Sequence, residues 1–82
     1  MSRCTIWVRR GCGPCAATVR DLVPELEGAG VGVEVLDVAD HPCRARDEGV
    51  DYLPTVVFEG GGRRVVCRGY PPPEFLESIL PD

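Results

Sequence analysis

The pattern of residues 4–38 restricts the topology of this chain more than any other feature. Residues 4–8 (CTIWV) are apolar and β-branched, which is typical of a short strand. Apolar residues then recur at spacings of three and four, as on one face of an amphipathic helix: Ala16, Val19, Leu22, Val23 and Leu26. Residues 31–38 contain alternating valines and predict a second strand. Because strand–helix–strand crossovers are right-handed, the two strands should lie parallel in one sheet.

Pro24 lies inside the predicted helix and is its least regular residue. Pro14 suits the first helical turn, where the backbone N–H has no partner. Pro24 instead lacks the N–H that would donate to the carbonyl of Arg20, and its ring crowds that carbonyl. We therefore expect the helix to kink or end near Val23, with a last turn before residues 28–30.

The rest of the chain predicts a short helix, a β-hairpin and a final helix. Asp40 has the side chain of an N-cap and precedes a short helical segment that closes at Gly49. Residues 55–59 and 63–68 flank a glycine turn and predict an antiparallel hairpin. Apolar residues within 75–80 predict the last helix.

The predicted order of elements is therefore βαβαββα, in one domain over residues 1–82. We expect an α/β fold in which a four-stranded mixed sheet is flanked by three helices. If the third strand lies antiparallel to the first, three segments meet at one edge of the sheet. These are the C-terminal end of the first strand, the start of the second helix and the N-terminal end of the third strand.

Charge and cysteine content exclude several classes of function. The chain has nine arginines, no lysine and 13 acidic residues, which gives a formal net charge of −4, and we expect no nucleic-acid partner. The N-terminal apolar run is too short for a signal-peptide core or a membrane span. A reducing cytoplasm is the expected compartment, and we expect the protein to be a monomer. Five cysteines in that compartment do not indicate a disulfide scaffold.

Residues 12–15 (CGPC) place two cysteines at the predicted start of the first helix. Unpaired backbone N–H groups and the positive end of the helix dipole favour a thiolate there, and Arg9 and Arg10 add positive potential. We expect the pKa of Cys12 to lie below the free value of about 8.5. Cys15 lies one turn further along and should be more buried. This asymmetry suits disulfide exchange, in which Cys12 attacks a disulfide and Cys15 resolves the mixed disulfide.

Residues 53–55 (LPT) form a second motif at the predicted entrance to the third strand. A proline there removes a hydrogen-bond donor from the sheet, and a cis peptide bond between Leu53 and Pro54 would explain its position. Such a bond would bulge toward Cys12. The backbone groups of Leu53 would then be free to pair with an extended peptide.

These motifs resemble those of the thioredoxin/glutaredoxin superfamily, and the resemblance covers nearly the whole chain. The matching segments are CGPC at 12–15, GVDYLPT at 49–55 and the glycine at position 69. The resemblance implies a minimal thioredoxin fold. It also implies that Cys12 is the nucleophile, Cys15 the resolving cysteine and Pro54 the cis-proline.

The resemblance further implies the substrate contacts and the source of electrons. The residues expected to bind substrate surround the cysteine pair: Gly13, Pro14, Leu53, Pro54, Gly69 and Tyr70. The implied activity is the reduction of protein disulfides, with a Cys12–Cys15 disulfide as the redox group and no bound cofactor. Electrons are expected from NADPH through a flavoprotein thioredoxin reductase, with glutathione as the alternative donor.

Three departures from the family pattern bear on the subtype. Thioredoxins usually carry tryptophan before the first cysteine, where this chain has Gly11, and a buried acid in the first strand, where residues 4–8 have none. The chain is similar to glutaredoxins in size and in its Arg-Gly-Cys approach. Glutaredoxins bind glutathione through Gly-Gly and an acidic residue, whereas residues 69–71 are Gly-Tyr-Pro. A thioredoxin of glutaredoxin size is therefore the expected subtype.

The alternative that the residues leave open is a non-enzymatic metal-binding module. Its ligands to zinc or an iron–sulfur cluster would be four side chains: Cys12, Cys15, His41 and Cys43. Outside such a site, Cys43 is expected to be inert. Cys4 and Cys67 fall on predicted strands and are expected at the core or the sheet edge, and Trp7 and Phe58 in the core.

Overall fold

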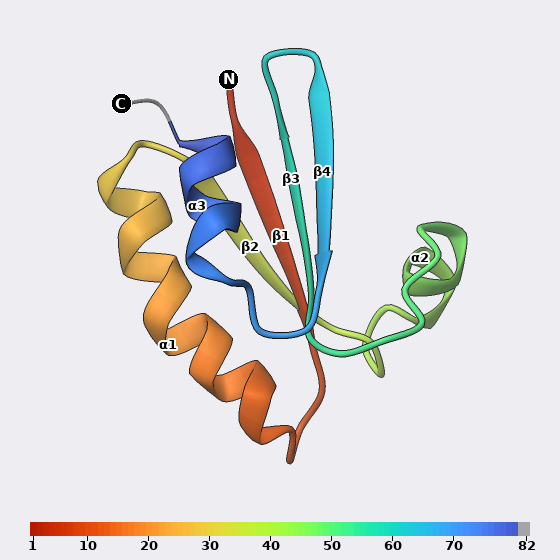
Figure 1. Cartoon of the computed structure of the whole chain (residues 1–82). Helices are drawn as coiled ribbons and strands as arrows, with labels where there is room; N and C mark the ends of the chain where they lie inside the picture. Colours follow the sequence, from red (N-terminus) through yellow and green to blue (C-terminus); the bar gives the residue numbers. More distant parts are fainter. Residues whose placement is uncertain (81–82) are drawn as a thin grey trace.

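A computed structural model describes residues 1–80 as four strands and three helices (Figure 1). The elements are β1 (Arg3–Val8), α1 (Gly13–Gly28), β2 (Gly32–Asp37), α2 (Pro42–Asp47), β3 (Thr55–Gly60), β4 (Arg63–Arg68) and α3 (Pro73–Ile79). Their order and type match the prediction from the sequence pattern. No helix within residues 1–80 is long and apolar enough to cross a membrane.

The four strands form one mixed sheet in the order β2-β1-β3-β4. β1 pairs with β2 in parallel, and β3 pairs antiparallel with both β1 and β4. In the β1–β3 pair, Trp7 lies opposite Thr55, so the C-terminal end of β1 and the N-terminal end of β3 lie at the same edge of the sheet. This confirms the predicted topology and brings the two sequence motifs to one edge.

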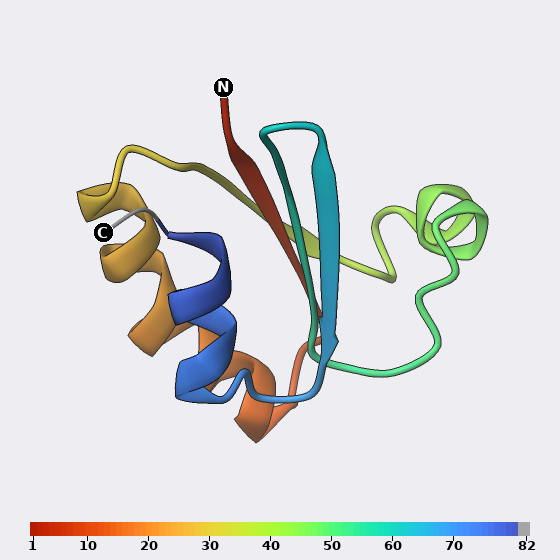
Figure 2. The same cartoon turned by 45° about the horizontal axis from the view of Figure 1, so that its top comes forward.

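The helices divide between the two faces of the sheet. Figure 2 shows α1 and α3 on one side and α2 on the other. The α1–α3 side contains the larger cluster of buried side chains: Cys4, Ile6, Leu22, Leu26, Val31, Val56, Phe58, Phe75 and Ile79. The α2 side contains four: Trp7, Leu36, Ala45 and Val57. The core positions expected for Cys4, Trp7 and Phe58 are thus confirmed.

α1 continues through Pro24 to Gly28, beyond the end near Val23 that the sequence analysis allowed. Leu22 and Leu26, on either side of the proline, are both buried against the sheet. Pro24 is exposed, and so is Arg20, whose carbonyl loses its helical donor. Burial of Leu26 therefore outweighs the missing hydrogen bond.

α2 begins at Pro42, but its N-cap residue is not the expected one. The N-cap position belongs to His41, which makes no capping hydrogen bond with its side chain, so the assignment of Asp40 as N-cap was wrong. The preceding turn is instead closed by Asp37, whose carboxylate accepts the backbone N–H of Ala39 at 2.8 Å. Asp40 lies inside this turn, where its backbone N–H donates to the carbonyl of Asp37 at 3.0 Å.

Candidate active site

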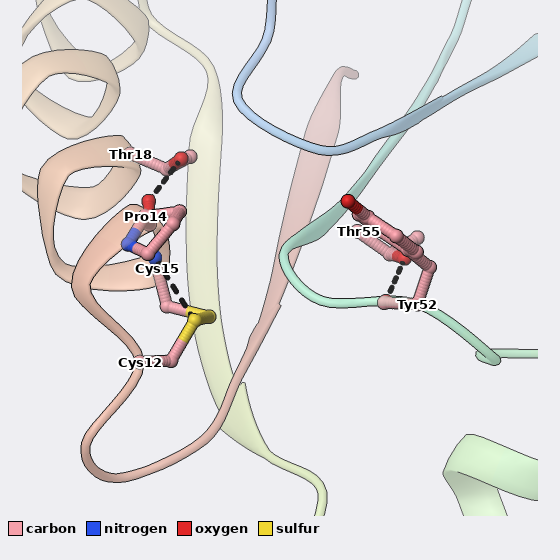
Figure 3. Close-up of a disulfide and its surroundings, with 6 residues drawn as sticks. All are labelled: Cys12, Pro14, Cys15, Thr18, Tyr52 and Thr55. Atoms are coloured by element: carbon pink, nitrogen blue, oxygen red, sulfur yellow. Dashed lines mark hydrogen bonds between the residues drawn. A yellow bond between two sulfur atoms is a disulfide. The ribbon is translucent and has the colours of Figure 1, made fainter.

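Cys12 and Cys15 are joined by a disulfide at the start of α1. Cys12 is the N-cap residue, and its sulfur accepts the backbone N–H of Cys15 at 3.2 Å (Figure 3). Cys12 is half-buried, whereas Cys15 is only 2% exposed. The structure therefore has the difference in burial that the sequence analysis expected, with the accessible sulfur against the N–H groups of the helix start.

A tight turn connects β1 to α1 and ends at Cys12. The backbone N–H of Cys12 donates to the carbonyl of Arg9 at 3.3 Å, and Gly11 occupies the third position of this turn with φ of 77°. Side chains with a Cβ rarely adopt that conformation. The glycine that departs from the thioredoxin pattern is therefore a requirement of the turn.

A partly buried polar contact stabilises the start of α1. The hydroxyl of Thr18 donates to the carbonyl of Pro14 at 2.8 Å, and Thr18 is fully buried (Figure 3). Pro14 lies within the first turn, where its missing N–H costs no helical hydrogen bond. Gly13 and Pro14 are both exposed beside the disulfide.

The segment before β3 carries the second motif. The Leu53–Pro54 peptide bond is cis, and the Pro54 carbonyl accepts the N–H of Gly69 at 2.7 Å. The hydroxyl of Thr55 donates to the carbonyl of Tyr52. Figure 3 shows this segment across from the sulfur atoms of the disulfide. Within residues 1–80, neither the N–H nor the C=O of Leu53 takes part in a backbone hydrogen bond.

An open groove of about 640 Å³ adjoins Cys12. Its walls are the turn with Arg9 and Cys12, the α2 residues Ala45 and Arg46, and residues 50–53. A second groove of about 430 Å³ lies on the other side of the turn, where Cys15 and apolar residues of α1 form the wall. Arg46 was not predicted from the sequence, because a solvent-facing arginine on a short helix carries no distinctive pattern.

The structure separates two residues that the sequence analysis grouped together. Gly69 is bonded to Pro54 and so adjoins the site. Tyr70 lines a different cavity of about 270 Å³ between α1 and the segment leading into α3, and Cys12 does not line it. The hydroxyl of Tyr70 donates to the carboxylate of Asp21, and this bond raises the pKa of Tyr70.

The structure does not assemble the alternative metal site. Within residues 1–80, no three His, Cys, Asp or Glu side chains are grouped so that they could hold a metal ion. His41, at the N-cap of α2, and Cys43, in its first turn, are exposed, and Cys12 and Cys15 are bonded to each other. The proposed ligand set of Cys12, Cys15, His41 and Cys43 was therefore wrong.

The other cysteines differ from Cys12 in their surroundings. Cys4 is 1% exposed, and burial raises the pKa of its thiol to about 12. Burial also raises the pKa of the half-buried Cys67. A raised pKa suppresses the thiolate that attacks disulfides, so neither of these residues has the surroundings of a nucleophile.

Comparison with known proteins identifies the architecture. No protein-family model matches the chain, and no curated protein sequence matches it. Among solved structures, mitochondrial thioredoxin 3 from Saccharomyces cerevisiae has a TM-score of 0.82 at 22% identity, over 95% of this chain and 76% of that one. Fasciola hepatica thioredoxin has a TM-score of 0.82 at 22% identity, over 95% and 77%.

Arabidopsis thaliana thioredoxin O2 in its oxidized state is similar to the same extent. Its TM-score is 0.82 at 18% identity, and the match covers 99% of this chain and 76% of that chain. At this level of sequence identity, the similarity shows a shared fold and nothing more. The chain has the thioredoxin fold, with a disulfide-linked cysteine pair at the start of its first helix.

Proposed function

We propose that this protein is a thiol–disulfide oxidoreductase that reduces disulfides in other proteins through Cys12 and Cys15. One observation carries the proposal: the linked pair lies at the start of α1 with one sulfur accessible and the other buried. A disulfide that closes so short a loop removes little entropy from the unfolded chain, so a structural purpose is a weak explanation for it.

The reaction transfers two electrons in two exchange steps. In the reduced protein, the thiolate of Cys12 attacks one sulfur of the substrate disulfide, and the other substrate sulfur leaves as a thiolate and takes up a proton. Cys15 then loses its proton and attacks the sulfur of Cys12. The Cys12–Cys15 disulfide forms, and the second substrate sulfur leaves as a thiolate and takes up the second proton. The substrate gains two electrons and two protons.

The start of α1 supports the first step electrostatically. The N–H of Cys15 already points at the sulfur of Cys12 at 3.2 Å, and the same donor would stabilise a thiolate after reduction. Arg9 and Arg10, directly before the turn, add positive potential. These groups favour the thiolate form of Cys12 at neutral pH.

The edge beside Cys12 supports binding of an extended substrate chain. The free N–H and C=O of Leu53 can pair with a peptide laid along the groove, as in the addition of a strand to a sheet. Pro54 and Gly69, bonded to each other, hold this segment in place. Gly13 and Pro14 would form the opposite side of the contact.

We further propose that the oxidised protein is regenerated in the cytoplasm by a flavoprotein thioredoxin reductase that uses NADPH. Glutathione with its own reductase is the competing donor. Coupled assays with each donor system, followed by NADPH absorbance, decide between them. The preferred donor will sustain turnover of a protein disulfide while the other will not.

Insulin disulfide reduction with dithiothreitol tests the activity itself. Cys12→Ser should abolish the acceleration of insulin precipitation, because it removes the attacking sulfur. Cys15→Ser should instead accumulate mixed disulfides, which mass spectrometry detects. Cys43→Ser is the matched control, because it removes an exposed cysteine outside the groove and should retain full activity. Full activity in Cys12→Ser would contradict the proposal.

A further inference from the structure

Positive charge gathers around the accessible sulfur although the chain as a whole is acidic. Arg9 and Arg46 line the 640 Å³ groove beside Cys12, one from the turn and one from α2. Arg9 also lines the second groove, together with Arg10. The net charge of the whole chain is −4, so this local excess of arginine is opposite in sign to the protein's overall charge.

These arginines lack strong partners inside the protein. Within residues 1–80, Arg9 and Arg10 take part in no ion pair, whereas Arg44 is bound to both Glu34 and Glu48. Arg46 makes one contact with Asp47, at 3.8 Å between side chains that are 77% and 73% exposed. An ion pair that open and long is weak. The guanidinium groups near Cys12 therefore remain available to a ligand.

The acidic residue in the groove wall, Asp51, already has an arginine partner outside the groove. Asp51 lines the groove, but its carboxylate accepts a hydrogen bond from Nε of Arg68 at 3.1 Å. The other wall residues from α2 and residues 50–53 are apolar apart from the hydroxyl of Tyr52. Among residues 1–80, the groove therefore presents apolar side chains between Arg9, which has no ion pair, and Arg46, whose ion pair with Asp47 is open and long.

We propose that the groove selects protein disulfides whose attacked cysteine is flanked by acidic residues. This inference rests on the proposed function and names the substrate class for the same site. Arg9 adjoins Cys12, and Arg46 lies on α2 in the wall of the same groove, so a substrate chain in the groove meets positive charge on two sides. Complementary charge raises the rate of productive encounter and disfavours partners of like charge.

Three disulfide-linked peptides of one sequence test the inference. They carry Glu, Gln or Lys on both sides of the attacked cysteine, and kcat/KM is measured for each with the reduced protein. We expect kcat/KM to be highest for the Glu peptide, lower for the Gln peptide and lowest for the Lys peptide. Each arginine that contacts the peptide should contribute a factor of about two to five. The preference should shrink in 1 M salt, where the screening length falls to about 3 Å from about 10 Å at 0.1 M.

Variants that each remove one arginine charge show which residues cause the preference for acidic peptides. Arg9→Gln and Arg46→Gln should each lower the ratio of kcat/KM for the Glu peptide to that for the Gln peptide. The ratio cancels any change in the reactivity of Cys12, which affects both peptides equally. Arg64→Gln is the matched control, because Arg64 is exposed on β4 near the hairpin turn at the far end of the sheet. It removes the same charge and should leave the ratio unchanged.

A neutral small disulfide, hydroxyethyl disulfide, separates the two proposals. If the protein reduces it and the peptides but treats Glu, Gln and Lys alike, the inference is wrong and the proposed function stands. Equal loss of the ratio in Arg64→Gln and Arg46→Gln would also overturn it, because the effect would then follow net charge. If no disulfide is reduced, both proposals fail.

Discussion

The two faces of the sheet are packed unequally, and the larger groove of the candidate site opens on the face with fewer buried side chains. Nine buried side chains join the sheet to α1 and α3, whereas the α2 face buries four. α2 spans only Pro42–Asp47 and contributes Ala45 alone to the core. The groove beside Cys12 opens against this helix. The chain thus concentrates its stabilising burial on one face and leaves the other able to form a binding surface.

On the α2 face, where few apolar side chains are buried, polar contacts also hold the helix to the sheet. The guanidinium of Arg44 lies 5.8 Å from the centre of the Trp7 ring and also bonds Glu34 and Glu48. The Nε1 group of Trp7 is buried without a hydrogen-bond partner among residues 1–80. Such a buried donor weakens the packing around it. We infer that α2 is held less firmly than α1.

The largest expected contrast between the faces is in cysteine reactivity. Cys4 lies in the α1–α3 cluster, and a pKa of about 12 leaves on the order of one thiol in 10⁴ ionised at pH 8. Cys43 is exposed on α2. In the native oxidised protein, iodoacetamide should label Cys43 at least about a hundredfold faster than Cys4, measured by peptide mass spectrometry.

Cys67 and the unfolded protein are the controls for the iodoacetamide labelling. Cys67 is half-buried with a raised pKa, so it should react at an intermediate rate. In denaturant, the three free cysteines should react alike because burial is gone. Native labelling of Cys4 as fast as that of Cys43 would show that the α1–α3 face is not the firmly packed one.

Matched leucine truncations compare the two faces in free energy. Leu26 is 0% exposed in the α1–α3 cluster, and Leu36 is 8% exposed in the α2 cluster. We expect Leu26→Ala to lower the free energy of unfolding by about 4 kcal/mol and Leu36→Ala by about 2 kcal/mol, measured by urea denaturation. Alanine favours helices over strands, so intrinsic propensity opposes this order. Equal or reversed losses would contradict the comparison.

The fold was predictable because its signals are local and repeated. The alternation in β2, the three-and-four spacing in α1 and the glycine turn between β3 and β4 each specify an element without tertiary information. The extension of α1 through Pro24 was not predictable in the same way. It depends on the burial of Leu26 against the sheet, which no local rule weighs against a lost hydrogen bond.

The site was only partly predictable, for a related reason. Cys12, Cys15 and Pro54 belong to short motifs, so the sequence marks them directly. Arg46 lines the groove because α2 packs against the face of the sheet that carries Trp7, and Tyr70 lines another cavity, where its hydroxyl bonds Asp21 on α1. Both outcomes depend on contacts between residues far apart in the sequence.

The bond between Tyr70 and Asp21 gives the smallest predicted effect. Arg20 and then Tyr70 lower the pKa of Asp21, and Asp21 raises the pKa of Tyr70. The lowered pKa contributes stability above about pH 4 that is lost as the carboxyl protonates, and the raised pKa contributes stability below about pH 10 that is lost as the phenol ionises. The hydrogen bond between Tyr70 and Asp21 therefore contributes stability between about pH 4 and about pH 10.

Titration of tyrosinate absorbance in a Tyr52→Phe background, where Tyr70 is the remaining tyrosine, measures this contact. Asp21→Asn should lower the pKa of Tyr70, because the phenol loses a carboxylate acceptor and its negative charge. The same substitution should leave the urea midpoint near neutral pH almost unchanged, because both side chains are exposed and the α1–α3 face is held by buried leucines. A midpoint loss as large as that of Leu36→Ala would mean that this surface bond, rather than burial, secures the face.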